Sequence, residues 1–317
     1  MSPHDNQTTI GILAVIATEV LYGCSFVFTK DVTTTIDPFT LLGWRFTTAL
    51  AALLILMAFR VIKVRITRST VKPLLLLAIF QPLLYYVCET YGVKRTTASE
   101  SGLIMAAIPV AIIVTAALLL RHRPLRQQAI GIGVTLVGVI GTVVAAGMTA
   151  NFDLLGYVLL FAAAGSYALY AVFADRHSQA ASDIEKTFVM VTAGALAFGT
   201  VTVAQHAASH TLSTLATLPF THPSFAIAVA YLALGSTIGA FFLQNVALSR
   251  IGSTRYSTFI GLATLTTLAT GAIFLHERLS IGQLVAGLVI LAGVYIANRR
   301  TDAVARPTSN NETETSS

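Results

Sequence analysis

Residues 123–139 read RPLRQQAIGIGVTLVGV, and residues 278–294 read RLSIGQLVAGLVILAGV. The two stretches share five residues at one constant spacing: Arg123, Gln128, Leu136, Gly138 and Val139 match Arg278, Gln283, Leu291, Gly293 and Val294. Following the same spacing toward the N-terminus pairs Arg95 with Arg250. The chain therefore carries one block twice, and a block with an odd number of membrane spans would give the inverted repeats found in solute transporters.

The composition indicates a membrane protein. Of the 317 residues, 55% are hydrophobic and 11% are charged, with a mean hydropathy of +0.76, whereas a soluble domain has roughly 25% charged residues. The net charge of +6 does not indicate nucleic-acid binding, because the basic residues are scattered between apolar stretches. Cys24 and Cys88 lack metal-ligand spacing, and we predict no metal and no other cofactor.

Ten apolar stretches are long enough to cross a bilayer as helices, which takes about 20 residues each. They cover roughly residues 10–29, 38–59, 73–93, 98–120, 127–147, 154–174, 187–207, 224–247, 253–275 and 281–298. Pro109 predicts a kink in the fourth stretch, because proline interrupts the helical hydrogen bonds.

The distribution of Lys and Arg predicts how these spans are oriented. With the N-terminus in the cytoplasm, Arg45 lies within a span and the only outside cations are Lys30, Lys94, Arg95 and Arg278. Both termini are then cytoplasmic. We therefore predict an all-α polytopic membrane protein with ten transmembrane helices. Its parts are two inverted five-helix repeats and a disordered cytoplasmic tail, at residues 10–147, 154–298 and 299–317.

The opening spans of the two copies also match, at a second constant spacing. Gly11, Ala17, Tyr22, Val27 and Phe28 align with Gly156, Ala162, Tyr167, Val172 and Phe173. Each copy thus opens with an aromatic residue followed by a small one, at Tyr22-Gly23 and Tyr167-Ala168.

These pairs belong to a set of motifs in a fixed order. The others are YGCSFVFTK at residues 22–30, Pro38 followed by Arg45-Phe46, and His276-Glu277-Arg278-Leu279. In this order the motifs resemble the EamA family of the drug/metabolite transporter superfamily, over about residues 10–298. The family often has Trp at the position of Tyr22 and Glu at the position of His122, and these departures leave the substrate open.

The resemblance implies a secondary active transporter, not an enzyme. Known members of the family export amino acids and other small metabolites, driven by proton or substrate gradients. We therefore expect a multi-pass protein of the plasma (inner) membrane whose partners are a small-molecule substrate and the lipid bilayer, with no nucleic acid. We expect it to be a monomer or a homodimer.

Glu19 is the first candidate functional residue. It lies near the middle of the first span, about 15 Å from either end, and Tyr22 and Phe26 share its helical face. Ionisable groups inside spans are costly and are functional candidates. Because burial disfavours the charged carboxylate, Glu19 is a candidate proton carrier as well as a substrate ligand. The alternative is a structural, protonated glutamate that bonds a neighbouring hydroxyl.

Arg45 and Glu89 are the other two clear cases of charged groups inside spans, away from the span ends. They lie about 10 Å and 6 Å from the outer ends of their helices, at similar depths. An unpaired charge in a low dielectric costs several kcal/mol, so the first interpretation is a structural ion pair. Arg45 is alternatively an outer gate, or an anchor for a substrate carboxylate.

The remaining candidate substrate-binding residues are aromatic or carry amides. Tyrosine offers apolar area with one hydrogen-bonding tip, which suits a partly apolar amphiphile such as an amino acid. The alternative role of such groups is to hold helices together. The set is Gln81, Tyr85, Tyr167, Tyr170, Gln244, Asn245 and Tyr256.

Three other functions stay open at this point. A sugar-phosphate or nucleotide-sugar exchanger would need cations deep in the cavity, and all cations apart from Arg45 lie at or beyond the span ends. The segment Ala17-Thr18-Glu19-Val20 resembles the first helix of the small multidrug resistance transporters, which makes multidrug efflux an alternative. The third is a non-transporting membrane scaffold protein.

Overall fold

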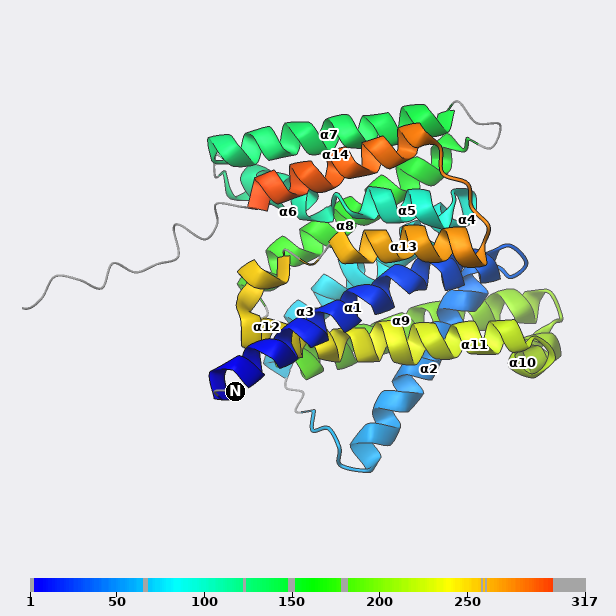
Figure 1. Cartoon of the computed structure of the whole chain (residues 1–317). Helices are drawn as coiled ribbons and strands as arrows, with labels where there is room; N and C mark the ends of the chain where they lie inside the picture. Colours follow the sequence, from blue (N-terminus) through cyan, green and yellow to red (C-terminus); the bar gives the residue numbers. More distant parts are fainter. Residues whose placement is uncertain are drawn as a thin grey trace, which may run out of the picture.

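The computed structural model describes residues 3–64, 68–121, 124–147, 152–177, 182–257, 259 and 261–298. The predicted tail, 299–317, lies outside the described residues. Eight described helices are long and apolar enough to cross a membrane, and two shorter apolar helices cover Gly261–Phe274 and Ile281–Ala297. The fold is that of an all-helical membrane protein, as the sequence predicts (Figure 1).

The described elements are helical throughout, with two π-helical segments. In chain order they are α1 (Pro3–Thr33), α2 (Pro38–Ala58), α3 (Arg68–Ala78), η1 (Ile79–Leu84), α4 (Tyr85–Arg95), α5 (Ala98–Met105), α6 (Ile108–Leu120), α7 (Arg126–Gly147), α8 (Leu154–His177), α9 (Asp183–Ala208), α10 (Leu212–Thr221), α11 (Pro223–Ala230), η2 (Tyr231–Gly239), α12 (Ala240–Ser257), α13 (Gly261–Phe274) and α14 (Ile281–Asn298).

Three spans are interrupted. The third consists of α3, η1 and α4, the fourth of α5 and α6, and the eighth of α11, η2 and α12. Pro109 lies in the first turn of α6, so the predicted kink is a complete break between two helices. The break at Gln81, whose φ of −141° and ψ of 120° are not helical, was not predicted. Pro82 was the available signal, because the residue before a proline disfavours the α conformation.

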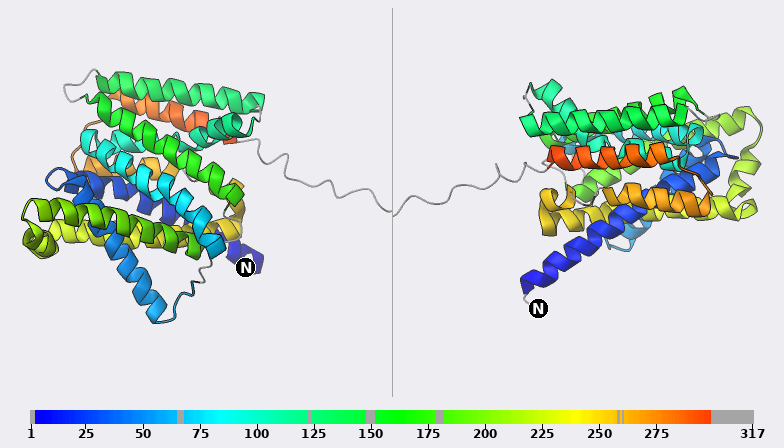
Figure 2. Two further views of the ribbon diagram at one scale, coloured as in Figure 1. Left: turned by 180° about the vertical axis from the view of Figure 1, so that it is seen from behind. Right: turned by 45° about the horizontal axis from the view of Figure 1, so that its top comes forward.

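Equivalent helices of the two copies run in opposite directions where they meet. In the α7–α14 pair, Gly131 lies against Ala297 and Gly138 against Ile290. These two helices lie side by side in each view, at the top edge of the bundle in Figure 1 (Figures 1 and 2). Because residue numbers rise along one helix as they fall along the other, the pair is antiparallel. Inverted repeats require that equivalent helices such as α7 and α14 run antiparallel, so this pair agrees with the predicted inversion of the two copies.

The doubled sequence stretch has a structural reason in the same pair. The Gln128 side chain accepts a hydrogen bond from the Leu125 N–H, and Gln283 accepts one from the Ser280 N–H, each 2.9 Å long. Both glutamines therefore satisfy amides that the start of a helix leaves unpaired. Gly138 and Gly293 each lie where a Cβ would come closer than 3.0 Å to the backbone of the facing helix.

A second contact, between a glycine and an arginine, occurs twice, once in each copy's equivalent position and at opposite ends of the bundle. Gly11 of α1 packs against Arg250 of α12, and Gly156 of α8 packs against Arg95 of α4. These are equivalent residues of the two copies. Figure 1 shows the start of α1 and the end of α14 at the same end of the molecule. That this end faces the cytoplasm stays a prediction.

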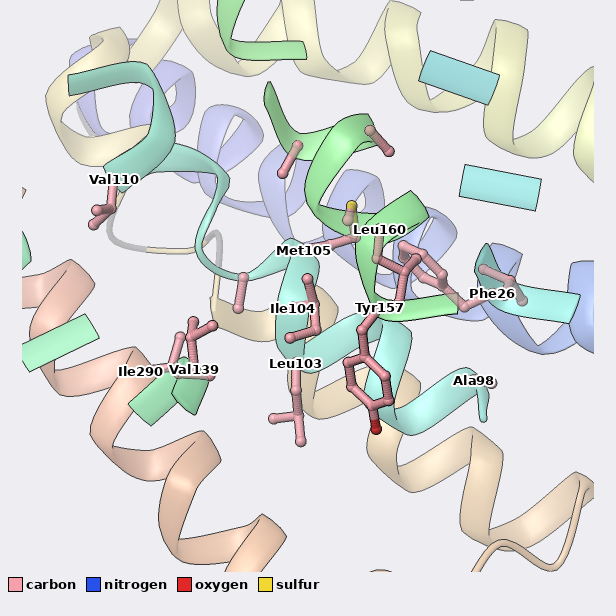
Figure 3. Close-up of a cluster of buried hydrophobic side chains, with 14 of the residues drawn as sticks. Phe26, Ala98, Leu103, Ile104, Met105, Val110, Val139, Tyr157, Leu160 and Ile290 are labelled. Atoms are coloured by element: carbon pink, nitrogen blue, oxygen red, sulfur yellow. The ribbon is translucent and has the colours of Figure 1, made fainter. Parts of the chain in front are cut away.

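The largest hydrophobic cluster surrounds α5. Leu103 and Ile104 are almost fully buried, between Tyr157 and Leu160 of α8 on one side and Ile290 of α14 on another (Figure 3). This cluster joins helices of both copies. It therefore provides the packed support next to which the polar cavity lies.

Candidate functional site

A cavity of about 510 Å³ lies between the two copies of the repeat. This volume is within the range of about 300–1,000 Å³ that is usual for small-molecule sites. Its described walls come from the first four spans of each copy, and neither α7 nor α14 contributes a lining residue. The α7–α14 pair therefore supports the structure outside the cavity.

Nearly all of the predicted site residues line this cavity. They are Glu19, Tyr22, Phe26, Arg45, Gln81, Tyr85, Glu89, Tyr167, Tyr170 and Gln244. The predicted Asn245 and Tyr256 belong to α12, and their side chains lie outside the part of the structure that is described. The common location of the ten residues does not test their roles in binding.

The lining residues correspond to one another across the two copies. Tyr22 matches Tyr167, Gln81 matches Ser236 and Glu89 matches Gln244, at the spacings found in the sequence, and all six face the cavity. Since α2 and α9 begin at Pro38 and Asp183, the spacing of the opening spans also pairs Arg45 with Met190, and both line the cavity. The cavity therefore lies on the axis that relates the two copies.

Arg45 is buried and bound by hydroxyl groups. Its Nε donates to Thr237 Oγ1 at 3.1 Å, and its Nη2 donates to Tyr86 Oη and Ser236 Oγ, both at 3.4 Å. The guanidinium carbon lies 4.5 Å from the centre of the Tyr86 ring, a distance at which a cation is attracted to the ring face. The arginine of the first copy is thereby tied to η2 of the second.

The expected ion pair between Arg45 and Glu89 is not formed in this structure. Among the described residues, the only ion pair within 4.0 Å joins Arg95 to Asp153. The Glu89 carboxylate instead accepts a hydrogen bond from the hydroxyl of Thr90 at 3.2 Å. Neutral hydroxyl groups therefore accept the hydrogen bonds of the Arg45 guanidinium, and both Arg45 and Glu89 line the cavity.

The two carboxylates are as deeply buried as the arginine. Glu19 is 4% exposed and Glu89 is 3% exposed, and both line the cavity. The second copy contributes no charged residue to the described lining. A buried charge needs partners, so a cavity with charges of both signs can bind a polar or charged ligand.

The π-helical segments occupy equivalent places in the two copies. Gln81 and Pro82 of η1 correspond to Ser236 and Thr237 of η2, and all four line the cavity. Such segments are frequently found at functional sites, and interrupted helices form the substrate sites of many transporters. The break at η1 is supported by Ser166 of α8, whose hydroxyl donates to the Phe80 carbonyl at 2.8 Å.

A series of aromatic rings connects the two copies across the cavity. The ring centres of Tyr85 and Tyr86 are 4.9 Å apart, those of Tyr85 and Tyr167 are 5.7 Å apart, and those of Tyr167 and Tyr170 are 6.0 Å apart. Tyr22 reaches across in the other direction, and its hydroxyl donates to Gln244 Oε1 at 2.9 Å. The walls thus offer apolar area together with hydroxyl groups.

Comparison with known proteins identifies the family. The model of the EamA-like transporter family matches residues 9–144 and again residues 154–299. The chain belongs to the EamA-like transporter family. It is therefore a membrane transporter with two EamA domains, and not an enzyme. Membership also implies a small-molecule substrate.

Relatives of this EamA protein match about nine-tenths of its length. It is 32% identical over 294 residues to "Uncharacterized transporter YcxC" of Bacillus subtilis (strain 168), covering 92% of this chain and 94% of that protein. It is 26% identical over 295 residues to a "Probable amino-acid metabolite efflux pump" of Salmonella typhimurium, covering 90% and 93%. A solved crystal structure with 21% identity matches 93% of this chain and 99% of its own, with a TM-score of 0.57. The structural likeness supports the fold alone.

Several lining residues of the EamA protein were missed by the sequence analysis. Tyr86 and Thr237 bind Arg45, and Ser25 and Met190 line the cavity. Helical periodicity along one span could not find them, because each is defined by a neighbour on another helix. The repeat itself was the unused signal: Ser25 and Met190 are the equivalents of Tyr170 and Arg45.

Proposed function

We propose that this EamA protein is a secondary active transporter that exports small metabolites, such as amino acids, across the plasma (inner) membrane. Substrate binds in the cavity between the two copies, and alternating access comes from rocking one copy against the other. The end that carries the N-terminus faces the cytoplasm, in keeping with its excess of Lys and Arg.

The observation that carries this proposal is the charge pattern of the cavity. An amino acid has a carboxylate, an ammonium group and a side chain. The Arg45 guanidinium can bind the first, the carboxylates of Glu19 and Glu89 the second, and the tyrosine rings the third. The relative that carries the printed description of an amino-acid metabolite efflux pump supports the same substrate class.

The other transporter classes have less support from the lining. A sugar phosphate needs several cations, and Arg45 is the only Lys or Arg among the described lining residues. Multidrug efflux would use Glu19 and Glu89 to bind a lipophilic cation and would leave Arg45 without a ligand group. Substrate panels should therefore contain amino acids and lipophilic cations side by side.

Counterflow in proteoliposomes tests this function. Vesicles with the purified transporter and a high internal concentration of one amino acid should accumulate the labelled amino acid. Tyr167→Ala should remove the accumulation, because it opens the wall shared by the two copies. Tyr295→Ala is the matched control, since Tyr295 lies on α14 and is 58% exposed. No flux of any amino acid, alongside flux of a lipophilic cation, would replace this proposal with multidrug efflux, whereas no flux of any solute would favour the scaffold alternative.

We further propose that Glu19 carries the coupled proton. Glu19→Gln cannot release a proton, so whatever counterflow the variant retains should no longer respond to an imposed pH gradient. Flux driven by the pH gradient at the wild-type rate in Glu19→Gln would contradict this role.

A further inference from the structure

The turn between α4 and α5 is held by two other segments. From α1, the Lys30 ammonium donates to the carbonyls of Lys94, at 2.9 Å, and Thr96. From the loop between α13 and α14, the Glu277 carboxylate accepts hydrogen bonds from the backbone N–H groups of Ala98, at 2.7 Å, and Ser99, at 2.9 Å. A carboxylate at a helix N-terminus satisfies unpaired amides and interacts favourably with the helix dipole. A residue of the second copy thus binds the first turn of α5 in the first.

A buried polar layer lies directly behind this contact. Glu100 accepts a hydrogen bond from the Gln283 side chain at 2.7 Å, and these two residues are 7% and 4% exposed. Ser99 and Ser101 are fully buried, and the first residue of α5 to line the cavity is Gly102. The layer therefore closes the cavity toward the end of the bundle that carries the α4–α5 turn.

The corresponding loop of the first copy repeats two described features of this one but differs from it in sequence. Arg121 and His276 are equivalent residues, and both have a φ of 54°. The glutamine hydrogen bonds that follow them, at Gln128 and Gln283, are also repeated. Yet the position equivalent to Glu277 is His122 in the sequence. The carboxylate therefore belongs to one of the two loops only.

From this asymmetry we propose that Glu277 is a latch that stabilises the conformation closed at the α4–α5 end. Opening this end requires the first turn of α5 to leave the α13–α14 loop. That movement breaks two hydrogen bonds to a charged group, which are stronger than those between neutral groups. The inference rests on the proposed function, because it assigns the contact to one step of alternating access. Without the carboxylate, the equilibrium shifts toward conformations open at this end.

Cysteine accessibility tests the latch without any substrate. In a background with Cys24→Ala and Cys88→Ala, the reporter Ser101→Cys lies in the closed layer and should react slowly with a membrane-impermeant maleimide. Adding Glu277→Ala should raise the labelling rate by about tenfold or more, the change expected from loss of hydrogen bonds to a charged group. Glu277→Gln should give a smaller increase, because its amide oxygen still accepts a hydrogen bond.

Arg278→Ala is the matched control. Arg278 is exposed in the same loop, and its removal should leave the labelling rate unchanged. A folded Glu277→Ala variant, checked by size-exclusion chromatography, that labels at the rate of its parent would overturn the latch. If Glu277→Ala does not fold, the same comparison with Glu277→Gln decides. Because labelling needs no flux, failure of the transport proposal and failure of the latch are separate outcomes.

Discussion

All charged side chains of the described cavity lining come from the first copy of the repeat, and the second copy contributes only neutral ones to it. Glu89 of the first faces the cavity from the position that Gln244 has in the second, and Arg45 faces it from the position of Met190. Each copy interrupts the equivalent span with a π-helical segment, although of the two only η1 has a residue with non-helical φ and ψ, Gln81. The two copies thus share the order of the spans that present side chains but differ in the chemistry those side chains provide.

The largest effect is expected from removing charge from the first copy. Glu89→Gln should lower transport by about tenfold or more, because a hydrogen bond to a charged group contributes about 1.5–3 kcal/mol. The double variant Glu89→Gln/Gln244→Glu moves the charge to the equivalent position, and its transport should stay low, since Arg45 and Glu19 remain on the first-copy side. Rates of counterflow measure both. Wild-type transport by the double variant would show that the two halves of the cavity are interchangeable.

The scaffold should behave symmetrically where the cavity does not. Gly138→Ala and Gly293→Ala each place a methyl group closer than 3.0 Å to the backbone of the facing helix. Each should lower the free energy of unfolding by about 1–3 kcal/mol, as overpacking does. Gly133→Ala is the control, because no atom lies within 4 Å of the added Cβ, and alanine favours the helix by about 1 kcal/mol or less. Thermal unfolding in detergent compares the three, and a neutral Gly138→Ala would contradict the close packing of α7 and α14.

A smaller effect distinguishes the two matched tyrosines. Tyr22→Phe removes the hydrogen bond to Gln244 and should lower the free energy of unfolding by about 1 kcal/mol. Tyr167→Phe should have less effect, because its hydroxyl makes no hydrogen bond with another described residue. Denaturation of the two variants under one condition gives the difference, and equal losses would mean that the second tyrosine gains a partner that the structure does not show.

The smallest expected effect on stability comes from the hydrogen bonds that Arg95 and its equivalent Arg250 make at the two ends of the bundle. Arg95 donates to Asp153 at 2.8 Å, whereas its equivalent Arg250 donates to the neutral Gln7 at the same distance. The hydrogen bond from Arg95 holds the pKa of Asp153 below its usual range. A lowered pKa adds stability above the unfolded-state pKa, and that stability is lost as the pH falls through the folded-state pKa.

Asp153→Asn should therefore lower the unfolding temperature slightly at neutral pH, and the difference from wild type should shrink in acid. The pair is exposed to solvent, so the shift should be close to the limit of detection. Thermal scans at neutral and acidic pH measure it. A difference that grows as the pH falls would contradict this assignment.

The sequence was sufficient for those features that depend on a single span or on the repeat. Apolar length predicted the helices, and the matched residues predicted two copies. Glu19, Tyr22, Tyr85, Tyr167 and Tyr170 line one cavity, whereas the side chain of the predicted Tyr256 lies outside the described part of the structure. The roles of these side chains in transport stay predictions.

Contacts between spans could not be predicted in this way. The partners of Arg45 are Thr237, Ser236 and Tyr86, and depth alone had favoured Glu89. Depth fixes only one coordinate of a side chain, whereas the rotation of its helix and the crossing of its neighbours fix the others. The break at Gln81 was missed for a related reason, since Ser166 on α8 supplies the hydrogen bond that supports it.

Each lining position of one copy has an equivalent position in the other copy, and this symmetry limits how a single copy could form the cavity as a dimer. A dimer of two first copies would put a glutamate at both equivalent positions and an arginine at both others. A dimer of two second copies would have no charge in the described lining at all. Joining two unlike copies in one polypeptide avoids both outcomes, because each position on the axis can then change without changing its counterpart. The difference in sequence between the copies, which one polypeptide always pairs with each other, is therefore what permits a binding site with two chemically distinct ends inside a symmetric scaffold.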